Sequence, residues 1–381
     1  MSRTRAAGPA ATVVLSLALT LSACSDDADD AANEPSDAVA TAGTPADATA
    51  GAEDGDALRT VEVVDGLVSP WGLVQLADGA VLVGERDTAR ILRVDGRMPI
   101  PLTTLPGVSA RGEAGLLGLA TTPEQDRVLA YYSTEDDNRI VAMTWDGTVL
   151  GEPEVLVSGI PGGAGYHQGG RLLLGPDDLL YVSTGDNGSP DSAQDPDSLS
   201  GKVLRFTTDG EPAPGNPFDS AVYSLGHRNI EGLAFDDRGR LWASEFGQDT
   251  WDELNLIEAG GNYGWPEVEG SGGGEDYLDP AVVWRTEDAS PAGLAFWDGS
   301  LWMAALRGRT LWEVPLTADD KADSAGEAGV GEPVAHLEGE LGRLRTVATT
   351  LDGDGLLLTT SNTDGRGDPA DGDDRLLRLG R

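Results

Sequence analysis

The sequence predicts an all-β protein, a six-bladed β-propeller of four-stranded antiparallel blades. Three observations predict this fold: turns rich in Asp and Gly between apolar runs, a segment that recurs along the chain, and 52 Gly with nine Trp among 381 residues. Apolar alternation around an Asp-Gly turn is typical of β-hairpins. Abundant Gly with scattered Trp favours many short strands over long helices.

The recurring segment consists of an apolar strand, an Asp- and Gly-rich turn and a second apolar strand. Clear copies occupy 72–83, 232–243 and 293–304, and weaker copies begin at Gly118, Arg171 and Thr346. Repeats of roughly 40–50 residues with several strands each are typical of propeller blades. Two large β-sandwiches are the alternative, and the regular spacing argues against them.

The first residues have the pattern of an export signal. Two arginines precede an apolar stretch, 10–21, that is too short for a stable membrane span. The stretch ends in Leu-Ser-Ala-Cys, which resembles a bacterial lipobox. We therefore expect residues 1–23 to be a lipoprotein signal peptide and Cys24 to be lipidated. The alternative is cleavage near Ala23 that leaves a free thiol. The lipid would hold the exported protein at the outer face of the cell membrane.

Composition separates a tether from the folded domain. Residues 24–57 consist mainly of Ala, Asp, Glu, Thr, Pro and Gly, with no aromatic residue. Such a segment cannot bury enough apolar surface to offset its ordering entropy. We expect a disordered acidic tether at 24–57 and the propeller at 58–381. The formal net charge of −39 excludes a nucleic-acid binder, and the single Cys excludes a Cys-rich zinc site.

Polar and ionisable residues gather in three stretches beyond what strand packing requires. The first is 165–171 with 181–186, the second is 226–229, and the third is 245–265. Two of the three histidines lie in these stretches. Loops from different blades converge on the central funnel of a propeller, so we expect the site there.

These segments resemble the soluble quinoprotein glucose dehydrogenase family, the aldose and sorbosone dehydrogenases that use pyrroloquinoline quinone (PQQ). The resemblance covers Thr60 to Gly380. It rests on six motifs in order, which begin at Pro70, Gly115, His167, Gly201, Gly226 and Gly261. It implies a six-bladed propeller with the quinone over the central channel, calcium that polarises the reactive carbonyl, and a histidine that takes the alcohol proton while hydride passes to the cofactor.

The resemblance assigns catalytic roles at the matching positions. It implies that His167 is the general base, that Asp186 orients it, and that Arg228 and Asn229 contact the quinone oxygens. A histidine titrates near neutrality, which suits a base, and an arginine stabilises charge that develops on reduction. On its own, Asp186 would be interpreted as an Asx turn.

The resemblance also implies that Arg307, Arg343 and Arg345 bind the cofactor carboxylates. A tricarboxylate in so acidic a protein requires concentrated arginines, whose guanidinium groups match carboxylates. Arg307 stands where the family has lysine. Glu113 stands where the family has glutamine. As a catalytic-site residue, Glu113 would accept hydrogen bonds from sugar hydroxyls or raise the pKa of His167.

Two calcium sites are implied in the same way. The backbone carbonyls of Gly247 and Gln248 match the ligands of the catalytic calcium, and Gln248 stands where the family often has proline. Glu253, with the backbone carbonyl of Tyr263, resembles a second, structural calcium site.

We therefore expect PQQ-dependent oxidation of a sugar hydroxyl, with an external electron acceptor that the sequence does not identify. A calcium-dependent propeller lactonase is the second hypothesis, and it would not need the three arginines that match the carboxylate-binding positions. A non-catalytic propeller that binds sugars or a protein at the cell surface is the third. It predicts no role for His167.

Overall fold

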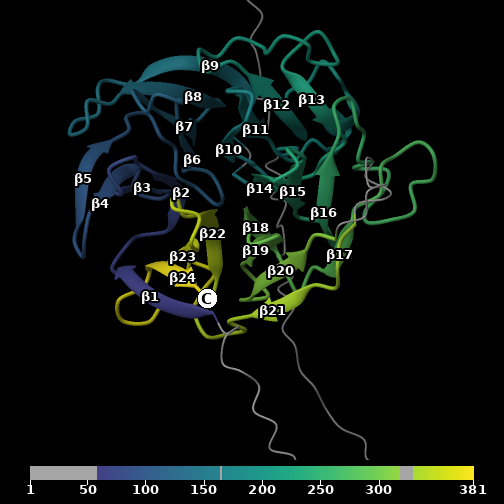
Figure 1. The fold of residues 1–381 in the computed structure, drawn as a ribbon. Helices are drawn as coiled ribbons and strands as arrows, with labels where there is room; N and C mark the ends of the chain where they lie inside the picture. The colour runs from purple at the N-terminus through teal and green to yellow at the C-terminus, as the bar shows by residue number, and fades with distance from the viewer. Residues whose placement is uncertain (1–57, 164, 318–328) are drawn as a thin grey trace, which may run out of the picture. The chain divides into compact units, whose positions relative to one another are not determined.

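The computed structural model describes residues 58–163, 165–317 and 329–381, so the predicted signal peptide, the tether and Cys24 lie outside the described residues. The described strands form six four-stranded sheets around a common centre (Figure 1). Neighbouring strands within the sheets are antiparallel. The structure confirms the predicted propeller of four-stranded blades.

Five blades follow the chain from the centre of the ring outwards. The first contains β2 (Pro70–Gln75), β3 (Val81–Glu85), β4 (Arg90–Val94) and β5 (Pro99–Thr104). The second contains β6 (Leu116–Thr121), β7 (Arg127–Ser133), β8 (Asp137–Thr144) and β9 (Glu154–Pro161). The third contains β10 (Leu172–Leu174), β11 (Leu180–Ser183), β12 (Lys202–Phe206) and β13 (Val222–Leu225). The fourth contains β14 (Ile230–Phe235), β15 (Leu241–Glu245), β16 (Trp251–Ile257) and β17 (Val282–Arg285). The fifth contains β18 (Pro291–Trp297), β19 (Ser300–Ala305), β20 (Leu311–Pro315) and β21 (Val334–His336).

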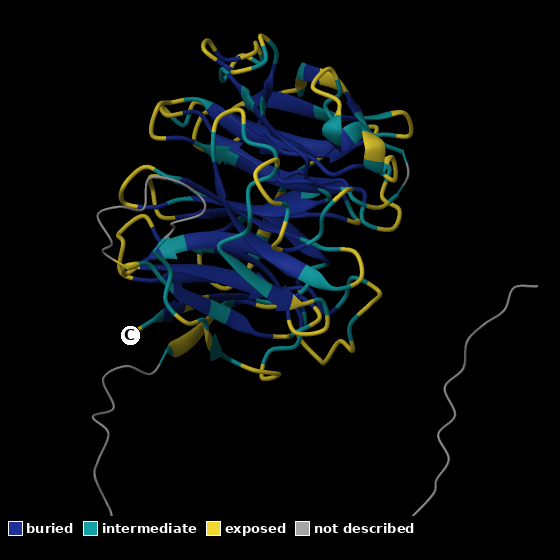
Figure 2. Cartoon of the chain, turned by 90° about the vertical axis from the view of Figure 1, so that its right-hand side faces the viewer, coloured by how far each residue is buried: buried dark blue, intermediate teal, exposed yellow. Residues whose placement is uncertain are grey.

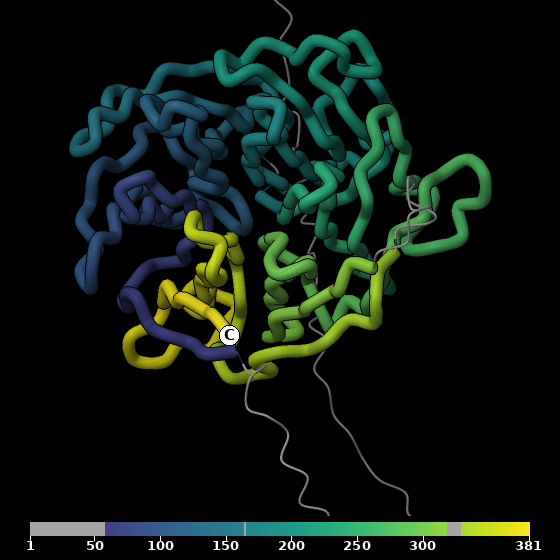
Figure 3. Tube along the Cα trace, viewed as in Figure 1, coloured from purple at the N-terminus to yellow at the C-terminus, as the bar shows by residue number. Residues whose placement is uncertain are grey.

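The sixth blade closes the ring with strands from both ends of the described chain. Its order from the centre is β22 (Leu344–Thr349), β23 (Leu356–Thr360), β24 (Leu376–Gly380) and β1 (Arg59–Val64). Arg59 lies opposite Gly380 in the β1–β24 pair. Figure 3 shows the purple start of the propeller beside its yellow end. Hydrogen bonds between these strands therefore fasten the ring.

The repeat glycines allow the inner strands of neighbouring blades to approach closely. A Cβ atom at Gly72 would lie 2.4 Å from the carbonyl oxygen of Leu117 in the next blade. A Cβ atom at Gly118 would lie 2.2 Å from the carbonyl oxygen of Gly170. Real Cβ atoms do not approach so closely, so this packing requires glycine at both positions. The contact between neighbouring blades thus explains why the repeat begins with glycine at these two positions.

Apolar side chains fill the space between the sheets. Trp242, Trp302 and Tyr131 are among the largest fully buried side chains, and exposed residues gather in the loops (Figure 2). The regular helix found in the described residues is one 3₁₀ turn, η1 (Pro190–Gln194). No helix in the described part of the chain is long and apolar enough to cross a membrane.

Truncating a buried leucine in the closing blade should destabilise the propeller. Leu358 in β23 is fully buried, and we expect Leu358→Ala to lower the free energy of unfolding by about 2–5 kcal/mol. Leu351, which is 61% exposed, provides the matched control. Chemical denaturation of both variants measures the difference. Equal losses for the two would contradict the packing described here.

Candidate active site

A cavity of about 200 Å³ lies at the end of the ring where the inner strands begin. His167 precedes β10, Arg228 and Asn229 precede β14, and Ser290 precedes β18. Seven of the predicted site residues line this cavity, namely Glu113, His167, Arg228, Asn229, Gly247, Gln248 and Arg307. The structure therefore brings together residues from loops that are far apart in sequence.

His167 and Asp186 form a hydrogen-bonded pair. Nδ1 of His167 lies 2.7 Å from Oδ1 of Asp186, and Asp186 is almost fully buried. The indole Nε1 of Trp265 donates to Oδ2 of Asp186 at 2.9 Å. Burial alone would raise the pKa of Asp186. The hydrogen bonds from His167, Gly188 and Trp265 outweigh burial and hold that pKa below its usual value.

The ionised carboxylate of Asp186 fixes the tautomer of His167. A carboxylate can only accept, so Nδ1 of His167 carries a proton, and in the neutral imidazole Nε2 would present its lone pair. Nε2 has no hydrogen-bonding partner among the residues that the structure describes. The imidazole of His167 therefore lines the cavity with Nε2 unpaired.

The backbone of His167 is held in an uncommon conformation. Its φ angle is +52°, in the left-handed region where non-glycine residues are rare. Oε2 of Glu113 accepts from the backbone N–H of His167 at 2.7 Å. Oδ1 of Asn229 accepts from the N–H of Gly169 at 3.0 Å. Two side chains from other blades thus impose the position of the imidazole.

Glu113 bridges two loops rather than standing free. While Oε2 holds His167, Oε1 lies 3.2 Å from the guanidinium of Arg366. The structure shows that Glu113 binds the His167 backbone. The expected contact between Glu113 and sugar hydroxyls stays a prediction.

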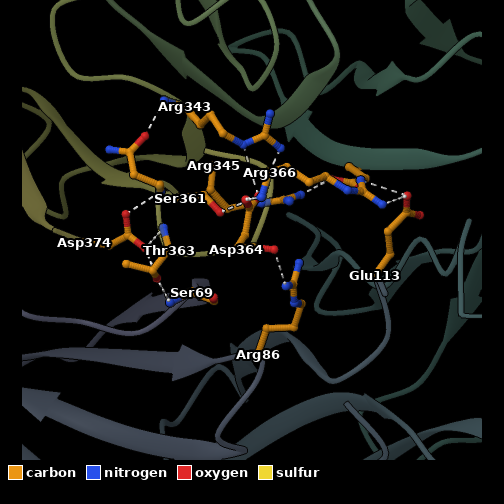
Figure 4. A network of polar contacts seen from close by, with 12 residues as sticks. Ser69, Arg86, Glu113, Arg343, Arg345, Ser361, Thr363, Asp364, Arg366 and Asp374 are labelled. Atoms are coloured by element: carbon orange, nitrogen blue, oxygen red, sulfur yellow. Dashed lines mark hydrogen bonds and ion pairs between the residues drawn. The ribbon is translucent and has the colours of Figure 1, made fainter. Parts of the chain in front are cut away.

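Four arginines, Arg86, Arg343, Arg345 and Arg366, gather around the closing blade, and Arg345 lies within β22 itself (Figure 4). Arg343 binds Asp364 through Nε and Nη2 at 3.1 and 3.0 Å. Arg86 reaches the backbone oxygen of Asp364, and Arg345 is ion-paired with Glu231 of β14. The predicted arginines Arg343 and Arg345 are therefore each paired with a carboxylate inside the protein.

Arg228 is partly buried between the cavity and an aromatic ring. Its guanidinium lies 5.4 Å from the centre of the Trp265 ring, and its backbone N–H donates to Glu245. Burial lowers the pKa of Arg228. Its Nε is buried without a hydrogen-bonding partner. Such an atom is costly unless a ligand oxygen accepts from it.

The turn that carries Gly247 and Gln248 is organised by Glu269. Oε1 of Glu269 accepts from the N–H groups of residues 248, 249, 250 and 251 at 2.7 to 3.1 Å. Oδ1 of Asp252 accepts from the N–H of Gly247 at 2.9 Å. These carboxylates take the N–H groups of the turn and leave the carbonyls of Gly247 and Gln248 without protein partners among the described residues.

A second, much smaller cavity of about 10 Å³ lies beside the first. Glu253 and Tyr263, the predicted second calcium site, both line it, together with Glu245 and Glu269. Burial, followed by repulsion from Glu245, raises the pKa of Glu253 to about 8. A volume of this size holds one water-sized particle, and a cation there would favour the ionised carboxylates.

Side chains alone do not form a complete metal site in the described part of the chain. The described residues contain no group of three or more His, Cys, Asp or Glu side chains arranged to hold a metal ion. Backbone carbonyls would have to supply part of any coordination sphere, as the sequence prediction requires. The free carbonyls of Gly247 and Gln248 are compatible with that prediction.

Sequence reasoning missed three residues that position the site. Trp265 lies in the motif that begins at Gly261, and its indole holds Asp186. Glu269 and Arg366 were not singled out, although they hold the 248–251 turn and Glu113. The Gly-Trp-Pro sequence at 264–266 was the one local signal; the other two contacts join distant segments.

Loops of different blades that converge on a histidine–carboxylate pair form the kind of site that a propeller enzyme requires. A family model described as Glucose / Sorbosone dehydrogenase matches residues 67–377. The chain belongs to this family. The resemblance seen in the sequence is thereby confirmed.

Individual relatives are similar over most of the propeller. The PQQ-bound form of aldose sugar dehydrogenase from Streptomyces coelicolor is 53% identical, with a TM-score of 0.80, over 85% of this chain and 98% of that chain. The aldose sugar dehydrogenase YliI of Escherichia coli is 28% identical over 80% of this chain and 90% of its own length. Quinoprotein glucose dehydrogenase B of Acinetobacter calcoaceticus is 34% identical over 55% of this chain and 52% of its own length.

Removing the Glu269 carboxylate should loosen the 248–251 turn. We expect Glu269→Ala to lower the free energy of unfolding at neutral pH by about 1–3 kcal/mol, because several N–H groups lose their acceptor. Glu267, exposed and two residues away, provides the matched control variant Glu267→Ala.

The pH dependence of the same variant has a definite sign. Burial alone would raise the pKa of Glu269, but the four N–H groups outweigh burial and lower it from 4.5. The stabilisation is therefore fully present above pH 4.5 and lost as the pH falls through the lowered pKa. Urea denaturation at several pH values should show the wild type and Glu269→Ala converging in acid. A gap that widens in acid would contradict this account.

Proposed function

We propose that this protein is a PQQ-dependent sugar dehydrogenase that oxidises an aldose hydroxyl. The observation that carries the proposal is the His167–Asp186 pair in the same cavity as Arg228. Family membership and the similarity to a PQQ-bound aldose sugar dehydrogenase support it. The arginines at the cavity favour this function over a lactonase, which would not need them.

The donors of the site fit an anionic, oxygen-rich cofactor. Nε of Arg228 and Nε of Arg345 are buried without partners, and Arg307 is exposed in the cavity wall with no partner among the described residues. Arg343 and Arg345 have N–H groups left beyond their internal ion pairs, because a guanidinium carries five. Arg228, Asn229, Arg307, Arg343 and Arg345 would hold PQQ.

Calcium would be bound by the carbonyls of Gly247 and Gln248, which Glu269 and Asp252 present. When bound, PQQ supplies the two-electron acceptor for the hydride that leaves the sugar carbon, and calcium supplies a Lewis acid. A second calcium ion at Glu253 and Tyr263 would neutralise buried carboxylates beside the cavity.

His167 would take the proton of the sugar hydroxyl on Nε2. Oxidation of an aldose removes a proton from oxygen and a hydride from the same carbon, and the product is the lactone. The imidazolium that forms is stabilised by the ionised carboxylate of Asp186, 2.7 Å from Nδ1. Arg228 would place positive charge next to a quinone oxygen, where negative charge would develop on reduction.

Tyr166 offers a platform for the sugar ring. It is 45% exposed and lies edge-on to His167, with ring centres 4.9 Å apart. An aromatic face packs well against the apolar C–H groups of a pyranose, and the phenol can bond a hydroxyl. The acidic protein would favour neutral sugars over anionic ones.

The route of the electrons beyond the site is part of the same proposal. Two electrons per sugar would pass to an external acceptor that the chain does not identify. We further propose that the exported protein is held at the outer face of the membrane through Cys24, with residues 24–57 as the tether.

Reconstitution tests the proposed function directly. We expect the protein with added PQQ and calcium to reduce a redox dye in the presence of aldoses, and calcium chelation to abolish the activity. His167→Gln should lower kcat by about a hundredfold to ten-thousandfold because the base is lost. His336→Gln is the matched control, since His336 pairs with Glu313 on an outer strand. No dye reduction across a broad sugar panel, with no PQQ binding, would rule out the proposal.

Trp265→Phe should move the titration of Asp186. Loss of the indole donor would raise the pKa of Asp186 by about one unit, and ¹³C NMR of the side-chain carboxylate measures that shift. Trp297→Phe, which loses a bond from Nε1 to the oxygen of Gly353, is the matched control. An unchanged pKa of Asp186 with lowered stability would mean that Trp265 is only structural.

A further inference from the structure

A further cavity lies away from the candidate active site. It has a volume of about 460 Å³ and is lined by residues at the far ends of the inner strands, among them Leu174, Phe235, Phe296 and Thr349. None of its lining residues lines the active-site cavity. The two cavities therefore occupy opposite ends of the inner strands.

The walls of this channel-end cavity are predominantly apolar. Leucine, phenylalanine, alanine and valine side chains from β2, β10, β14, β18 and β22 supply most of its lining. Leu173, Phe235, Phe296 and Ala348 are only partly buried, so their side chains are accessible to a ligand.

One buried cation also lines the cavity. Arg171 is only 8% exposed, and its guanidinium stacks on Trp71 at 4.1 Å from the ring centre. Nε donates to the backbone oxygen of Glu231, and Nη2 donates to the hydroxyl of Thr346. Nη1 makes no hydrogen bond with any described residue.

Arg171 forms no ion pair with any described residue. Glu231 is the carboxylate whose charge acts on it, and Glu231 is ion-paired with Arg345. The neighbouring Arg343 and Arg86 have their own partners in Asp364 and Asp87. Two guanidinium groups thus share one carboxylate in the centre of the ring. Burial lowers the pKa of Arg171 to about 9, which still leaves it cationic at neutral pH.

We propose that the channel-end cavity binds an amphiphile with a carboxylate head and a linear apolar tail. The head would accept from Nη1 of Arg171 and neutralise the excess charge, and the tail would pack against the partly buried leucine and phenylalanine side chains. The cavity volume lies within the range of small-molecule sites. This site is independent of the proposed sugar oxidation and has its own ligand.

A panel of probes on the wild-type protein distinguishes the contribution of the carboxylate head from that of the apolar tail. Decanoate, decanol, decylamine and acetate are titrated by calorimetry into the full-length protein, below the critical micelle concentration of each. Decanoate should bind one to one. Decanol should bind at least tenfold more weakly, and decylamine and acetate more weakly still. Equal affinity for decanoate and decanol would overturn the role of Arg171, and no decanoate binding would overturn the site.

Two variants locate the ligand. Ala348→Phe fills the cavity and should weaken decanoate binding at least tenfold, whereas Val334→Phe adds the same ring on an exposed outer strand and should not. Arg171→Gln should abolish the preference of the site for decanoate over decanol. Thermal unfolding checks that each variant is folded. Wild-type affinity in folded Ala348→Phe would place the ligand elsewhere and overturn the proposal.

Discussion

The pairing of buried charge at the centre of the ring is the constraint on which the remaining structure depends. Arg345 and Glu231 come from the sixth and fourth blades and neutralise each other across the channel. Removal of one partner from such a pair leaves a charge in a medium of low dielectric constant, which typically costs about 3–5 kcal/mol. The blades that contribute these residues are therefore fixed relative to each other. The loops that precede the same inner strands are therefore anchored at one end, which helps to hold side chains such as Arg228 in place.

Much of the architecture can be predicted from the sequence, because the repeat reflects the close packing of neighbouring inner strands. Gly72 and Gly118 mark places where one inner strand meets the next with no room for a side chain. The proximity of His167 and Asp186 follows equally from local structure. They flank β10 and β11, which pair antiparallel, so the hairpin brings its two ends together. Roles within the site came from the resemblance, since the spacing of residues does not state which histidine is a base.

The parts that sequence reasoning did not find are contacts between distant segments. Arg366 reaches Glu113 from the opposite end of the domain, and Glu269 folds back on a turn about twenty residues earlier. No sequence periodicity links such pairs, because they depend on the conformations of loops that belong to different blades. Arg343 and Arg345, two of the predicted arginines, are each ion-paired with a carboxylate inside the protein. Their partners, Asp364 and Glu231, could not be identified from the sequence, because the chain contains many other acidic residues that pair with neither arginine.

The mixed composition of the sixth blade has a consequence for the order of events during biosynthesis. β1 is the first strand of the domain to leave the ribosome, and its neighbour β24 is the last. Until residue 380 has emerged, β1 has no strand to pair with and β22 and β23 have no outer cover. The nascent domain is thus an open arc with unpaired edges, and pairing over the whole length of the domain belongs to the slowest class of folding step. Closure of the ring therefore waits for the last strand of the propeller, although its partner strand is the first to be made.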